Sequence, residues 1–167
     1  MIQLRAKKST PDEIRAMAKA ILPVTRRANV GLVINDYVDI AREVGADFCH
    51  LGQEDLLEVR SQKSEVRIGI STHSPDQAKR ALAAGADYIA IGPVYATGTK
   101  PTAKPVTLEY VRWAAKSVTI PWFAIGGINL ENLGDVLAAG AKRICVVSAI
   151  LNAKDVTKTC AEFRKRI

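Results

Sequence analysis

The fold is decided by one stretch, Leu82-Ala83-Ala84-Gly85-Ala86-Asp87-Tyr88-Ile89-Ala90-Ile91-Gly92, in which a helix-like segment passes through a Gly-Ala pair into a short apolar run. Closely similar phrases occur at residues 42–52 and 137–147. Each glycine of the phrase stands where the end of a helix needs a positive φ. Each apolar run has the length of a strand buried on both faces. The repeat therefore predicts helices that alternate with parallel strands.

Similar apolar runs elsewhere bring the number of predicted strands to seven. They cover residues 2–5, 31–35, 48–52, 67–71, 88–92, 122–125 and 143–147. Helical patterns cover residues 11–28, 37–44, 74–83, 107–115, 129–138 and 155–166, and Thr10 and Pro11 are suited to begin the first of these. Such alternation without a topological switch predicts an α/β fold of the TIM (β/α)8 type, with ligand-contacting residues at the C-terminal ends of the strands.

Size and composition limit the classes of protein to consider. The chain has 167 residues, 48% of them hydrophobic and 5% aromatic, which predicts a single α/β domain over 1–167. Its net charge of +7 makes nucleic acid, an anionic membrane surface and small phosphorylated ligands the partners to consider, although many of the basic residues would serve only to solvate the surface. The basic residues are not interleaved with aromatic residues, so the sequence does not indicate a nucleic-acid partner. No apolar stretch is long enough to span a membrane. The cysteines lack metal-ligand spacing and are expected to be reduced, with the cytoplasm as the default compartment.

Polar side chains follow the predicted strands and should face one opening. Asp36 and Asp55 follow neighbouring strands and are candidates to hold a hard cation such as Mg²⁺, although an acidic residue after a strand also serves as a helix cap. Arg5, Lys7 and Lys100 belong to the same group of strand ends. A metal ion together with these cations is suited to bind a pyrophosphate.

A second cluster of candidates is suited to a phosphate. The segment Ala124-Ile125-Gly126-Gly127-Ile128-Asn129 reads as a strand, two glycines and the start of a helix, which would present backbone N–H groups to an anion. The same glycines would also serve a tight turn with nothing bound. Ser148 follows the next strand, and Thr97-Gly98-Thr99-Lys100 offers hydroxyls and a cation. Of the histidines, His50 is predicted to be a packing residue and His73 to reach the opening.

Taken together, these motifs resemble the thiamine phosphate synthase family over nearly the whole chain. The matching pieces are Gln3-Leu4-Arg5-Ala6-Lys7, Asn35-Asp36, His50-Leu51-Gly52-Gln53-Glu54-Asp55, Ile68-Gly69-Ile70-Ser71, Gly92-Pro93-Val94, Thr97-Gly98-Thr99-Lys100-Pro101, Ala124-Ile125-Gly126-Gly127-Ile128 and Val146-Val147-Ser148-Ala149-Ile150.

The resemblance implies a (β/α)8 barrel that joins hydroxymethylpyrimidine pyrophosphate to thiazole phosphate, with Mg²⁺ as cofactor. Asp36 and Asp55 would hold the metal. The implied pyrimidine pyrophosphate site consists of Gln3, Leu4, Arg5, Ala6, Lys7, Asn35, Ser71 and Lys100, and the implied thiazole phosphate site of Thr97, Gly98, Thr99, Gly127, Val147 and Ser148. Arg5, Lys7, Ser71 and Lys100 would be the catalytic groups, acting on a pyrophosphate that leaves before the thiazole nitrogen attacks.

One departure from the family pattern leaves alternatives open. Members carry a strand and a helix before the motif at Gln3, so seven of the eight barrel strands are expected here, and an open sheet edge favours self-association into a homo-oligomer. A thiazole tautomerase shares the barrel, and His73 would suit its proton transfer. The third alternative is an inactive, truncated homologue that retains phosphate binding.

Overall fold

The computed structural model describes residues 1–55, 66–98 and 104–167, and they form two compact units. Unit 1 contains Met1–Ser71 and Ala81–Asp87, and unit 2 contains Thr72–Arg80 and Tyr88–Ile167. The described residues include seven strands, as predicted.

Unit 1 is built on parallel strands that neighbour one another in chain order. They are β1 (Ile2–Leu4), β2 (Leu32–Asn35), β3 (Phe48–Leu51) and β4 (Arg67–Thr72), whose last residue belongs to unit 2. In register, Leu4 faces Ile34, Asn35 faces His50, and His50 faces Gly69. Parallel pairing brings the C-terminal ends of these strands to one edge, where the predicted site residues follow them.

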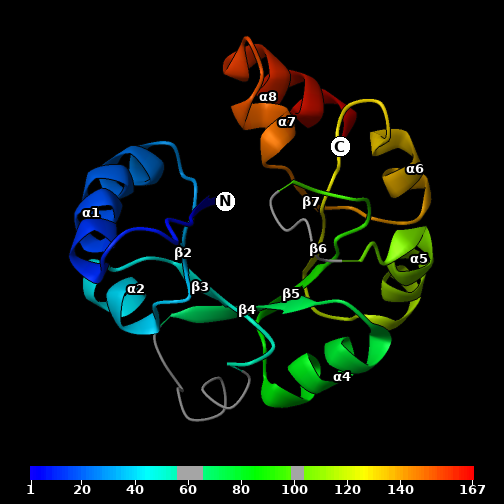
Figure 1. The fold of residues 1–167 in the computed structure, drawn as a ribbon, viewed down its shortest axis with the longest axis horizontal. Coiled ribbons are helices and arrows are strands. Elements are labelled where there is room, and N and C mark those ends of the chain that lie inside the picture. The colour runs from blue at the N-terminus through cyan, green and yellow to red at the C-terminus, as the bar shows by residue number, and fades with distance from the viewer. Residues whose placement is uncertain (56–65, 99–103) are drawn as a thin grey trace. The chain divides into compact units, whose positions relative to one another are not determined.

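Two helices cover these strands on one side, α1 (Pro11–Arg27) and α2 (Val38–Val44), and they lie side by side (Figure 1). Thr10 begins α1 as predicted: its hydroxyl accepts from the Glu13 N–H at 3.3 Å, and the Glu13 carboxylate accepts from the Thr10 N–H at 2.8 Å. This reciprocal pair satisfies two N–H groups that the helix itself leaves unbonded.

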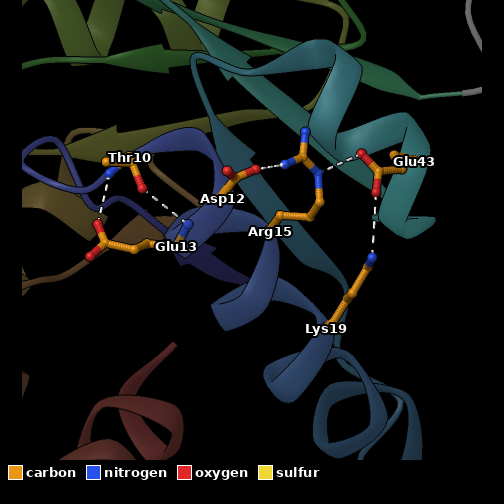
Figure 2. Close-up of polar contacts among 6 residues, drawn as sticks. All are labelled: Thr10, Asp12, Glu13, Arg15, Lys19 and Glu43. Carbon is orange, nitrogen blue, oxygen red and sulfur yellow. Dashed lines mark hydrogen bonds and ion pairs between the residues drawn. The ribbon is translucent and has the colours of Figure 1, made fainter.

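An ion-pair network joins α1 to α2 (Figure 2). Arg15 on α1 contacts Glu43 on α2 at 2.6 Å and Asp12 on its own helix, and Lys19 reaches the other oxygen of Glu43 at 3.4 Å. Beneath this network, Ile14, Ala18 and Leu22 form the buried face of α1.

The repeated Gly-Ala phrase has the predicted backbone geometry. Gly45, Gly85 and Gly140 have φ values of 71°, 88° and 101°. In the first two copies, the aspartate that follows the Gly-Ala pair hydrogen-bonds to a backbone N–H near the start of the preceding strand. The Asp47 carboxylate accepts from the Leu32 N–H at 2.9 Å, and the Asp87 carboxylate accepts from the Ile68 N–H at 2.7 Å. These bonds couple each phrase to its neighbouring strand.

Unit 2 contains three strands that pair in parallel, β5 (Tyr88–Ile91), β6 (Trp122–Ile125) and β7 (Ile144–Cys145). Ile91 faces Ala124, and Ile125 faces Cys145. The helices are α4 (Pro75–Ala84), whose last turn belongs to unit 1, α5 (Thr107–Ser117), α6 (Leu133–Ala138), α7 (Ser148–Leu151) and α8 (Val156–Arg166). In Figure 1, α5 lies next to α6, and α7 next to α8.

Two boundaries in unit 2 differ from the prediction. The helix expected from Asn129 begins at Leu133, because the side chains of Asn129 and Asn132 hydrogen-bond to nearby N–H groups and form a turn first. The strand expected over 143–147 is limited to Ile144–Cys145, because the chain then turns into α7, which was not predicted.

None of the helices in the described ranges has both the length and the apolar character that crossing a membrane requires. In the same ranges, which include all three cysteines, no disulfide forms.

Candidate active site

A small cavity in unit 1 collects the residues that follow β1 and β2. Its volume is about 190 Å³, and it is lined by Leu4, Ala6, Lys7, Ile14, Asn35, Asp36 and Tyr37. All but Ile14 and Tyr37 were predicted as site residues. Ile14 comes from the buried face of α1, and Tyr37 immediately precedes α2, so the two helices complete the walls that the strand ends begin.

Within this cavity the Lys7 Nζ lies 3.6 Å from the Asp36 Oδ2. The side chains are 55% and 41% exposed, so the pair is screened by water and contributes little to the stability of the fold. Asp36 has a φ of 70°, an unusual conformation for a residue other than glycine, and its N–H donates to the His50 carbonyl at 3.0 Å. The chain therefore turns sharply after β2 and holds a charged pair accessible to a ligand.

The second predicted metal ligand, Asp55, lies in the turn after β3. Its Oδ2 accepts a hydrogen bond from the Gly52 N–H at 3.1 Å. Burial, followed by the negative charges of Asp36, Asp39 and Asp55, raises the pKa of the Cys49 thiol to about 12. Asp36 and Asp55 therefore both lie within electrostatic range of one buried residue of β3.

These two carboxylates fit a magnesium ion better than a zinc ion. Among the described residues, no group of three or more His, Cys, Asp and Glu side chains is arranged to hold a metal. Mg²⁺ commonly takes one or two carboxylates and completes its shell with water and substrate phosphate, whereas a closed zinc site needs more nitrogen or sulfur ligands from the protein.

Ser71, near the end of β4, is held by two polar side chains from β3 and the turn after it. His50 Nε2 lies 2.9 Å from the Ser71 Oγ, and the Gln53 Nε2 donates to the Ser71 carbonyl at 2.6 Å. His50 is 9% exposed. The prediction that it only packs was incomplete, because burial and a polar contact to a site residue occur together. The sequence contains one signal for this, a histidine at the strand end that leads to Asp55.

Two other predicted residues of unit 1 lie apart from the cavity. Gln3 belongs to β1 and Arg5 follows it; both are exposed, and neither lines the cavity that contains Lys7. Their predicted roles as ligands of the pyrophosphate substrate stay predictions.

In unit 2 the predicted phosphate loop follows β6. Gly127 has a φ of 64°, and a Cβ atom there would lie 2.5 Å from the Ala96 carbonyl oxygen and 2.7 Å from the Tyr95 Cβ. Only glycine fits this close approach. Among the described residues the Gly127 N–H has no hydrogen-bond partner, while the Gly127 carbonyl accepts from the Asn132 Nδ2 at 2.9 Å. The loop is thus fixed and retains one backbone donor.

The expectation that a helix N-terminus adds further donors at Asn129 was wrong. The Asn129 Oδ1 already accepts from the N–H groups of Glu131 at 2.9 Å and Asn132 at 3.0 Å. The Asn129 N–H in turn donates to the Asn132 Oδ1. The two asparagines use these donors before α6 begins.

The other predicted thiazole phosphate residues of unit 2 follow β5 and β7. After β5 the chain runs along the end of β6, where the Val94 N–H donates to the Ile125 carbonyl and the Tyr95 N–H to the Gly126 carbonyl. This leads to Thr97 and Gly98. Val147 and Ser148 follow β7 and are exposed. Because β5, β6 and β7 are parallel, these residues and Gly127 follow strand ends at the same edge. Thr99 and Lys100 lie outside the described residues.

His73 belongs to a different cavity of unit 2, with a volume of about 730 Å³ and a wall that includes Lys104, Tyr110 and Trp113. Its Nδ1 hydrogen-bonds with the Gly92 carbonyl, and its N–H donates to the Gln77 Oε1 at 2.6 Å. The first bond requires the proton of His73 to be on Nδ1, since a carbonyl only accepts.

Comparison with known proteins identifies the family to which these sites belong. Residues 1–150 match the family model described as thiamine monophosphate synthase. The chain belongs to the thiamine monophosphate synthase family. Thiamine-phosphate synthase from Thermus thermophilus is 45% identical over 169 residues, a match that covers 100% of this chain and 82% of that protein. Thiamine-phosphate synthase from Gloeobacter violaceus is 46% identical over 170 residues, and the chain spans 50% of its length.

Solved structures agree with this membership. Thiamine phosphate pyrophosphorylase from Pyrococcus furiosus matches with a TM-score of 0.91 and 37% identity, covering 98% of this chain and 80% of that one. A 3-hexulose-6-phosphate synthase matches with a TM-score of 0.70 at 20% identity, a likeness of fold alone. The predicted α/β fold of the TIM-barrel type is thereby confirmed for this member of the thiamine monophosphate synthase family.

Proposed function

We propose that this chain condenses hydroxymethylpyrimidine pyrophosphate with thiazole phosphate to form thiamine phosphate and release pyrophosphate. The observation that supports this best is the exposed pair of Lys7 and Asp36 in the cavity of unit 1. An exposed lysine and carboxylate contribute little to folding, yet they suit a diphosphate and the cation that accompanies it. Membership of the thiamine monophosphate synthase family gives this ligand its identity.

The proposed reaction needs charge stabilisation and no nucleophilic side chain. The bond from the pyrimidine methylene carbon to the diphosphate oxygen breaks, and its electron pair leaves with the diphosphate. The thiazole nitrogen then uses its lone pair to form the new bond to that carbon. Lys7 and the Ser71 hydroxyl are proposed to stabilise the charge that develops on the leaving diphosphate. Arg5 and Lys100 are proposed to add positive charge there.

Magnesium is proposed as the cofactor, with Asp36 and Asp55 as its protein ligands. When bound, Mg²⁺ would act as a Lewis acid toward diphosphate oxygens. The donor set supports this choice, since Mg²⁺ commonly takes one or two carboxylates from a protein and would take its other ligands from water and substrate phosphate. Lys7 would exchange part of its contact with Asp36 for the diphosphate.

Unit 2 is proposed to bind the thiazole phosphate. The Gly127 N–H is a backbone donor without a described partner, on a loop that tolerates no side chain. Gly98, Thr97, Val147 and Ser148 follow neighbouring strand ends and are proposed to complete the phosphate site with Thr99. The position of these residues after strand C-termini agrees with the general rule for ligand sites in this fold.

Direct assay tests the proposal. Purified protein incubated with both substrates and Mg²⁺ should form thiamine phosphate and pyrophosphate in equal amounts. Absence of both products from folded protein would overturn it. Isomerisation of the thiazole phosphate without Mg²⁺ and without the pyrimidine substrate would instead indicate a tautomerase.

The proposed compartment is the cytoplasm, supported by three cysteines that form no disulfide in the described residues.

A further inference from the structure

Ser71 is anchored at two separate atoms. Its hydroxyl oxygen lies 2.9 Å from the His50 Nε2, and its carbonyl accepts from the Gln53 Nε2 at 2.6 Å. A serine hydroxyl normally rotates among staggered positions, and its proton turns toward whichever acceptor is near. The contact with the His50 Nε2 restricts the rotation of the Ser71 hydroxyl.

His50 is itself held firmly, so it can serve as a reference point for Ser71. Its side chain is 9% exposed, and β3 pairs with β2 and β4 on either side of it, where Asn35 and Gly69 are its register partners. The His50 carbonyl accepts the Asp36 N–H at 3.0 Å. One residue therefore connects the serine of β4 to the aspartate that follows β2.

The direction of the hydrogen bond between His50 and Ser71 decides what Ser71 can offer a ligand. A serine hydroxyl has one proton. If the Ser71 hydroxyl donated to Nε2, that proton would be used inside the protein, and only oxygen lone pairs would face an anionic ligand. If Nε2–H donates to the Ser71 Oγ, the hydroxyl proton stays available for a phosphate oxygen. Only the second arrangement is favourable beside a diphosphate.

We propose that His50 is a positioning residue: its Nε2–H donates to the Ser71 Oγ and orients the Ser71 hydroxyl to donate to a diphosphate oxygen of the pyrimidine substrate. This inference rests on the proposed function, because it takes the diphosphate as the ligand of unit 1. It assigns to a buried histidine a role that acts through another side chain.

The test is a double-mutant cycle with His50→Leu and Ser71→Ala. Inorganic pyrophosphate with Mg²⁺ is titrated into each protein by calorimetry, and KM is measured separately for each substrate. We expect His50→Leu to weaken pyrophosphate binding about tenfold and to raise the KM of the pyrimidine pyrophosphate by a similar factor, with the KM of thiazole phosphate unchanged. In the Ser71→Ala background, His50→Leu should have no further effect, because the group through which His50 acts is gone.

Two additional variants separate positioning from structural damage. His50→Gln retains an N–H donor at similar reach and should restore most of the binding, whereas His50→Asn is too short and should behave as His50→Leu does. The Asn variant also replaces the Leu variant if the latter does not fold. Equal losses in the wild-type and Ser71→Ala backgrounds, or equal changes in both KM values, would overturn the inference.

The calorimetric measurement distinguishes this inference from the proposed function. Wild-type protein that binds pyrophosphate but forms no thiamine phosphate would refute the synthase proposal, while the binding cycle would still report on His50. Wild-type turnover with no coupling between His50 and Ser71 would refute the positioning role alone.

Discussion

The ammonium nitrogen of Lys7 lies 3.6 Å from the Oδ2 of Asp36, so the segment after β1 and the residue after β2 meet at one pair of opposite charges. Asp36 adopts a left-handed φ of 70° at this point. Aspartate and asparagine tolerate this conformation better than most residues, which makes it possible to remove the charge without removing the turn.

The first prediction is that Asp36→Asn lowers turnover by at least about 100-fold while leaving the thermal unfolding midpoint nearly unchanged. The substitution removes a proposed metal ligand but preserves the backbone turn. Steady-state kinetics with both substrates measures the loss. The matched control is Asp39→Asn, an exposed carboxylate in the first turn of α2, which should keep its activity. Equal turnover by the Asp36 variant and wild type would exclude Asp36 from the reaction.

The second prediction compares two glycines of unit 2. Gly127→Ala should destabilise the protein by about 2 kcal/mol, because its Cβ would collide with the Ala96 carbonyl at a positive φ. It should also weaken thiazole phosphate binding. Gly134→Ala meets no atom within 4 Å and lies inside α6, so it should be neutral or stabilise by up to about 1 kcal/mol. Denaturant unfolding of both variants measures the difference, and a more stable Gly127 variant would contradict the close approach.

The third prediction concerns the pH dependence of the ion pairs between α1 and α2 shown in Figure 2. The hydrogen bond from Arg15 is the largest cause that lowers the pKa of Glu43. A lowered pKa in the folded state stabilises the fold above the pKa of the unfolded chain, and this contribution is lost as the pH falls through the folded pKa. Glu43→Gln should therefore reduce stability at pH 7 and have no effect at strongly acidic pH.

Urea unfolding across this pH range measures the effect, which should be small because the pair is exposed. Glu131→Gln is the control, since Glu131 is exposed and forms no ion pair with the described residues. A difference between wild type and Glu43→Gln that grows as the pH falls would have the wrong sign for this network.

The fourth prediction is that the cysteines differ in reactivity. Cys160 is exposed, whereas burial raises the pKa of the Cys145 thiol and, with nearby carboxylates, raises that of Cys49 to about 12. A thiol reagent at pH 8 should therefore modify about one equivalent in the native protein and all three thiols after denaturation. Cys160→Ser should remove the fast reaction. Fast native labelling that persists in this variant would show that a second thiol is accessible.

The sequence alone predicted the features that depend on local geometry. Gly45, Gly85 and Gly140 terminate helices at positive φ, and Thr10 begins α1, because these preferences act over a few residues of backbone. The alternation of helical patterns with apolar runs was sufficient to predict the seven strands and the fold class. The motifs also predicted five residues that line the cavity of unit 1.

Only the tertiary structure decided how side chains meet across strands. His50 and Ser71 are 21 residues apart, and their contact depends on the register between β3 and β4, in which a slip of one residue would turn each side chain to the other face. The late start of α6 likewise follows from competition between the Asn129 and Asn132 side chains and the helix for the same N–H groups. Local preference determines which elements form, whereas register and packing determine which polar atoms come within bonding distance.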